Sequence, residues 1–174
     1  MTALDMEIPE LLSRISPRNN TDICLVPAIH GRIGPGADGD LGSIRGYVPL
    51  PSSVVKGVAD PVAGWLGSDL VLPRELAARD LVLLDQSPLA RAAPAAGLLW
   101  VVSEGTGLRV RYLALEKDRL RIGNALTRED PARWQSIPLQ GRNILKIVRA
   151  RIVWMGREIE KAPAGPADAA GQGD

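Results

Sequence analysis

Apolar residues in this chain alternate with polar ones, or form short unbroken runs, in several separate segments. Alternation is typical of a strand with one buried face, and a short apolar run is typical of a strand buried on both faces. Segment 108–112 alternates, which places Arg109 and Arg111 together on its polar face. The other segments of strand length are 23–29, 46–50, 81–84, 97–103, 119–122 and 144–154. This pattern predicts a mostly β domain of several short, largely antiparallel strands.

Only a few stretches favour a helix, and all of them are short. One helix is predicted within residues 4–15, after Pro9, and about one helical turn within residues 73–78. Segment 51–63 predicts a helical or irregular crossover, and the proline- and alanine-rich segment 88–94 predicts a connector. We therefore expect one or two short helices beside the strands.

No internal repeat or long linker divides the chain, so one core is expected. Three parts are predicted: an extension with the short helix (1–21), the β domain (22–161) and a disordered tail (162–174) rich in Ala, Gly, Pro and Asp. The glycine-rich segment 30–42 predicts a mobile surface loop. It lacks the Gly-Lys-Ser/Thr sequence and the following helix of a phosphate loop.

Composition narrows the classes of function. The 174 residues carry 21 Lys and Arg against 20 Asp and Glu, so the net charge of +1 does not by itself predict nucleic-acid binding. No apolar window reaches the length of a membrane span and no signal segment is recognisable, so a cytoplasmic protein is expected. Cys24 and His30, the single residues of their types, lack neighbouring ligands for zinc, and no cofactor is expected.

The most informative stretch runs from Leu66 to Asp85. A turn of small and acidic residues, Gly67-Ser68-Asp69, is followed by Pro73 and then by the apolar run 81–84 between two aspartates. The order of motifs along the chain is G-Y-V-P-L-P, G-S-D-x-x-x-P, R-D-L-V-L-L-D, G-L-L-W-V-V-S, L-R-V-R-Y-L and R-I-V-W-M-G-R-E. In this order the chain resembles, from Cys24 to Ile159, the self-cleaving peptidase domain of LexA and phage repressors. The resemblance implies the fold of that domain.

The resemblance also implies where catalysis would occur. In the family a serine, activated by an unprotonated lysine, cuts a bond in the protein's own linker. The serine position corresponds to Leu70 and the lysine position to Arg111. Leucine has no nucleophile, and arginine stays protonated and cannot act as a base. No catalytic residue is therefore expected. Where the family has the cleaved Ala-Gly or Cys-Gly pair, this chain has Ile33-Gly34 or Gly36-Ala37.

These observations predict an inactive peptidase-like domain that serves as a dimerisation or protein-binding module, in transcriptional or phage regulation. The predicted partners are a second copy of the chain, an extended peptide or a helix-turn-helix regulator. The predicted binding residues are Asp69, Leu70, Val71, Arg109 and Arg111, with the two arginines exposed. Two alternatives are an active hydrolase that uses Ser68 with Lys117 or Lys56, and DNA binding through Arg109, Arg111, Arg149 and Arg151.

Overall fold

Within residues 22–157, nine strands join into one sheet in the order β2-β1-β3-β4-β9-β5-β6-β7-β8. The computed structural model describes residues 22–157. The strands are β1 (Ile23–Ile33), β2 (Asp40–Pro51), β3 (Pro61–Leu66), β4 (Leu81–Asp85), β5 (Leu99–Glu104), β6 (Gly107–Glu116), β7 (Arg119–Gly123), β8 (Gln135–Pro138) and β9 (Val148–Gly156). The short helices are α2 (Ser52–Val55), α3 (Pro88–Ala92), η1 (Pro131–Arg133) and η2 (Ile144–Lys146). The predicted mostly β fold with short helices is confirmed.

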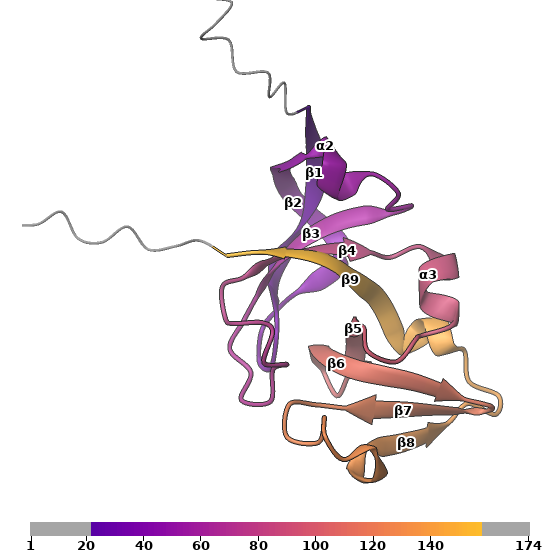
Figure 1. Cartoon of the computed structure of the whole chain (residues 1–174). Coiled ribbons are helices and arrows are strands. Elements are labelled where there is room, and N and C mark those ends of the chain that lie inside the picture. The colour runs from indigo at the N-terminus through magenta and orange to yellow at the C-terminus, as the bar shows by residue number, and fades with distance from the viewer. Residues whose placement is uncertain (1–21, 158–174) are drawn as a thin grey trace, which may run out of the picture.

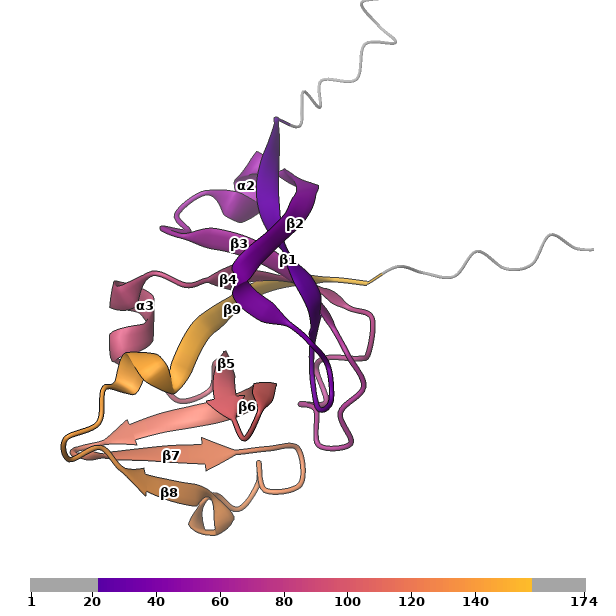
Figure 2. The ribbon, with the colours of Figure 1, turned by 180° about the vertical axis from the view of Figure 1, so that it is seen from behind.

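Strand β9 holds the two halves of the sheet together. It pairs antiparallel with β4 on one side and with β5 on the other. Figure 1 shows it passing from the group β5 to β8 into the group β1 to β4, and Figure 2 shows the same arrangement from behind. All strand pairs are antiparallel except β1 with β3. The last strand of the described part of the chain therefore lies in the middle of the sheet.

The glycine-rich segment 30–42 was predicted to be a surface loop. Most of it instead belongs to the two strands of a hairpin. Strand β1 continues to Ile33 and β2 begins at Asp40, so that only the residues between them turn. Gly39 allows the two arms to approach closely, because a Cβ atom there would lie 2.1 Å from the Arg32 carbonyl oxygen. The glycines that suggested a mobile loop instead allow the two backbones to approach closely, because glycine has no side chain.

Other predicted elements differ in detail. Strands β3 and β8 were not predicted, and helix α3 occupies most of the predicted connector 88–94. Residues 73–78 form hydrogen-bonded turns, one of them from the Leu76 amide to the Pro73 carbonyl, rather than a helical turn. The predicted helix within 4–15 and the tail 162–174 lie outside the described residues.

Buried side chains form a core on each face of the sheet. One cluster includes Ile33, Val62 and Val101 on one face, while the opposite face carries a cluster around Leu83 in the first half and another around Trp100 in the second. Strand β9 contributes to all three clusters. Val148, Ala150, Ile152 and Trp154 were predicted to share one face, which is wrong at both ends. Ala150 and Ile152 belong to the first cluster, but Val148 lies in the cluster of Trp100 and Trp154 packs against that of Leu83. A register shift separates each end from the middle pair.

Candidate functional site

The loop between β3 and β4, residues 67–80, is attached to strand β6 by a buried ion pair. Asp69 Oδ2 lies 3.1 Å from Arg111 Nη1, and the two side chains are 5% and 6% exposed. Asp69 Oδ1 accepts a hydrogen bond from the Val71 amide at 3.0 Å. Both carboxylate oxygens are therefore used, one for the turn and one for the neighbouring strand.

Arg111 has two further acceptors. Its Nε donates to Glu104 Oε2 at 3.0 Å, and its Nη1 also donates to the Val110 carbonyl at 2.8 Å. The expectation that Arg111 is exposed is wrong, because β6 lies between β5 and β7 and the 67–80 loop covers this end of it. Arg109, two residues earlier, is half-buried, and its nearest acceptor is the Leu108 carbonyl at 3.5 Å.

Leu70 was predicted to line a cleft. Its side chain instead projects completely into solvent. Its side chain is 102% exposed, although both of its neighbours are tied to the fold. Asp69 is held by Arg111, and the Val71 carbonyl accepts a hydrogen bond from the Ala125 amide at 3.2 Å. The residue opposite Arg111 is therefore the carboxylate of Asp69, and the leucine beside it forms an apolar knob on an anchored loop.

A second set of contacts anchors the same loop further along. Tyr112 donates a hydrogen bond to Glu75 Oε2 at 2.7 Å, and Arg128 Nη1 lies 2.6 Å from Glu75 Oε1. Burial and the hydrogen bond to Glu75 raise the pKa of Tyr112 to about 12. Partial burial of the Glu75 carboxyl opposes a fall in its pKa, but the hydrogen bond from Tyr112 and the charge of Arg128 lower it. The Tyr112 ring also stacks on Trp134, with centroids 6.4 Å apart.

The turn between β1 and β2 lies against the start of this loop. The Gly67 amide donates to the Ile33 carbonyl at 2.8 Å. A Cβ atom on Gly34 would lie 3.3 Å from Gly67 Cα, and one on Gly107 would lie 3.7 Å from the Gly34 carbonyl oxygen. The residues that correspond by resemblance to the cleavage segment are thus adjacent to the loop of Asp69.

Ser68 is exposed, and no hydrogen bond joins its hydroxyl to a lysine within residues 22–157. The four arginines proposed for DNA binding are also in different environments. Arg111 is buried, while Arg149 and Arg151 line two separate cavities. These positions do not favour a continuous basic stripe.

The remaining candidates have local partners. His30 Nε2 lies 3.5 Å from Asp38 Oδ2, and Cys24 Sγ lies 3.2 Å from Ser52 Oγ. Across residues 22–157, no group of three or more His, Cys, Asp or Glu side chains is arranged to hold a metal ion. Over the same range, no helix is long and apolar enough to cross a bilayer.

No protein-family model matches the chain, and no curated protein matches it significantly. Geometry alone locates the candidate site, because the fold brings Asp69 and Arg111 together from positions 42 residues apart. Sequence reasoning selected both residues but assigned the position opposite Arg111 to Leu70. The signal for Asp69 was its place immediately after Gly67-Ser68, where a short acidic side chain can cap the turn.

Proposed function

We propose that this domain is a catalytically inactive relative of the LexA and phage-repressor peptidase domains, and that it acts as a dimerisation or protein-binding module in transcriptional or phage regulation. The observation that carries the proposal is the ion pair between Asp69 and Arg111. These residues occupy the loop and the strand on which the resemblance places nucleophile and base. A carboxylate held by a guanidinium supplies neither an attacking hydroxyl nor a neutral amine.

The absence of self-cleavage is tested by incubating the full chain at alkaline pH, where an unprotonated amine would act best as a base. We expect the intact mass to persist and a serine-directed covalent probe to leave the protein unlabelled. The matched control is Ser68→Ala. Discrete fragments, or probe labelling, that disappear in this variant would contradict the proposal and favour a hydrolase.

An exposed apolar face on β1 and β2 supports the association role. Ile23, Leu25 and Tyr47 are 57%, 68% and 66% exposed, and the pairing of β1 with β2 places them on one face. Strand β2 is also the end strand of the sheet. Because a strand at a sheet edge has unpaired backbone groups, and because most homodimers use one patch twice, we assign this face to a second copy of the chain.

Light scattering coupled to size exclusion tests the dimer. We expect about twice the chain mass of 18.6 kDa, and a shift to the monomer in Leu25→Asp. Leu89→Asp is the matched control, because Leu89 is 88% exposed but lies on α3. A wild-type monomer at micromolar concentration, or dissociation by both variants alike, would contradict this face as the interface. The resemblance suggests a helix-turn-helix regulator as a further partner, which co-purification from the native host tests.

A further inference from the structure

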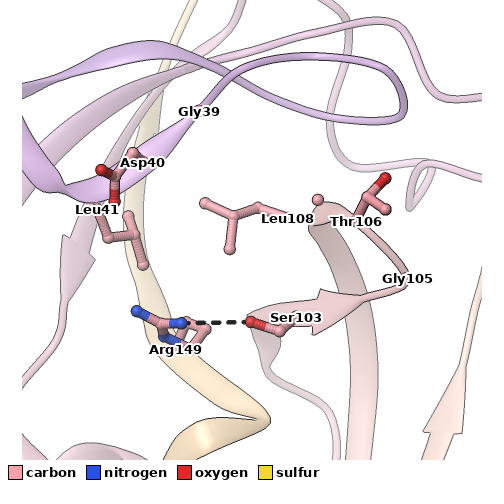
Figure 3. A pocket seen from close by; sticks show the side chains of 9 residues that line it. Gly39, Asp40, Leu41, Ser103, Gly105, Thr106, Leu108 and Arg149 are labelled. Carbon is pink, nitrogen blue, oxygen red and sulfur yellow. Dashed lines mark hydrogen bonds between the residues drawn. The ribbon is translucent and has the colours of Figure 1, made fainter.

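A cavity of about 290 Å³ lies between the β1–β2 hairpin and the turn that joins β5 to β6. We call it the Arg149 pocket. Its lining residues are Gly39, Asp40, Leu41, Ser103, Gly105, Thr106, Gly107, Leu108 and Arg149. Figure 3 shows Leu41 and Leu108 reaching into it, with Arg149 and Ser103 on one side and Asp40 on the hairpin. The pocket is separate from the Asp69–Arg111 pair.

Arg149 brings a positive charge to this pocket without an acidic partner among residues 22–157. Its only side-chain hydrogen bond there is from Nη1 to Ser103 Oγ, at a long 3.4 Å. Burial lowers the pKa of the Arg91 guanidinium, the positive charge of Arg149 lowers it further, and the carboxylate of Asp60 opposes this fall to a smaller extent. The charge of Arg149 therefore repels a neighbouring cation, and an anion bound at Arg149 would reduce that repulsion. A guanidinium also presents paired N–H donors in the geometry that suits a carboxylate.

The other walls restrict which anion fits. Leu41 and Leu108 are 4% and 8% exposed and provide an apolar floor. The Asp40 carboxylate accepts the Gly42 amide at 2.9 Å with one oxygen, and its charge opposes a doubly charged phosphate at the same place. An N–H group of a ligand would instead be attracted to Asp40. The cavity volume of about 290 Å³ lies just below the usual range for ligand pockets, so the pocket suits a single residue rather than a long segment.

We propose that the Arg149 pocket binds the free C-terminal residue of a polypeptide that ends in an aliphatic side chain. Such a residue carries three groups on one carbon atom: a carboxylate for Arg149, an amide N–H for Asp40 and an apolar side chain for the two leucines. Capture of a chain terminus is a recurring mode of peptide recognition. The inference rests on the proposed protein-binding function and names the part of the partner that is recognised.

Titration of the isotope-labelled full chain with N-acetyl-leucine, followed by amide NMR shifts, tests the proposal. We expect saturable shifts at Gly105, Thr106 and Gly107, with a dissociation constant on the order of 1 mM for so small a ligand. N-acetyl-leucine amide, which lacks the carboxylate, should not produce saturable shifts. Arg149→Gln should weaken binding at least tenfold, whereas Arg133→Gln, which removes an exposed arginine that does not line the pocket, should not.

Several outcomes overturn the inference. Equal binding of the acid and the amide excludes carboxylate recognition, and equal binding of inorganic phosphate makes this a general anion site. Tighter binding of free leucine than of N-acetyl-leucine makes it a site for a free amino acid. Should Arg149→Gln fail to fold, Thr106→Glu at the exposed turn adds a repelling charge and must also weaken binding. If the wild-type protein is a dimer but does not bind N-acetyl-leucine, this inference is overturned and the proposed dimerisation stands.

Discussion

Asp69 and Arg111 form an ion pair 3.1 Å long that is almost fully excluded from solvent and joins the 67–80 loop to strand β6. Removing one partner of a buried pair leaves the other charge poorly compensated and lowers the free energy of unfolding strongly. Replacing both partners with apolar residues of similar size costs much less. The pair therefore makes the position of the loop dependent on two specific side chains.

We predict that Asp69→Ala lowers the free energy of unfolding by about 3 kcal/mol, measured by urea denaturation, because Arg111 keeps only the half-exposed Glu104 as a carboxylate partner. Glu104→Gln is the control, because Glu104 also contacts Arg111 but is 42% exposed. It should cost no more than about 1 kcal/mol. The double variant Asp69→Ala, Arg111→Met should recover part of the loss, since it removes the buried cation that Asp69→Ala leaves with Glu104 as its remaining carboxylate. Equal effects of Asp69→Ala and Glu104→Gln would show that the pair is not buried in solution.

The exposure of Leu70 predicts a contrast with a nearby leucine. Leu70→Ser should change the free energy of unfolding by no more than about 0.5 kcal/mol, because the side chain has no packing to lose. Leu66→Ala, at the end of β3 and 0% exposed, should cost about 2–5 kcal/mol. Thermal or urea unfolding measures both. A large loss in Leu70→Ser would mean that another surface covers this residue in the free protein.

Arg91 connects helix α3 to η2 and to the first residue of β9. Its guanidinium donates to the carbonyl oxygens of Val148 at 2.8 Å and Gln86 at 3.2 Å, and also to that of Leu145. Arg91→Ala should therefore destabilise the fold by about 2–3 kcal/mol, because three carbonyl groups lose a charged donor. Arg74→Ala, at an exposed position, should have an effect within about 0.5 kcal/mol. Equal urea midpoints for the two variants would contradict the role of Arg91.

Tyr112 should ionise at unusually high pH. In a Tyr47→Phe variant it is the only tyrosine, so absorbance near the phenolate band reports its pKa directly, with an expected midpoint of about 12. Because the folded state holds this proton more tightly than the unfolded state, its stabilisation is complete below about pH 10 and is lost as the pH rises towards 12. Adding Glu75→Gln should lower the midpoint, since it removes the charge that the phenolate would face. An unchanged midpoint would contradict that contact.

The hydrophobic pattern predicted strands correctly where the local sequence alone favours a strand. The run 81–84 and the alternation from 108 to 112 predicted β4 and β6 because their side chains are buried within a sheet whichever strands lie beside them. Strand β3 escaped prediction because its sequence begins with a proline and contains a glycine. Its pairing with β1 and β4 compensates for those weak local preferences.

The sequence by itself determined a mostly β domain, the turn at Asp69 and the absence of a lysine on β6 where the resemblance requires a base. Only the tertiary structure decided that Asp69, rather than Leu70, meets Arg111, and that this arginine is buried. The physical reason is that alternation along a strand assigns a side chain to a face, but not what covers that face. Here the cover is a loop from 42 residues away, and its carboxylate is what allows a guanidinium to leave water.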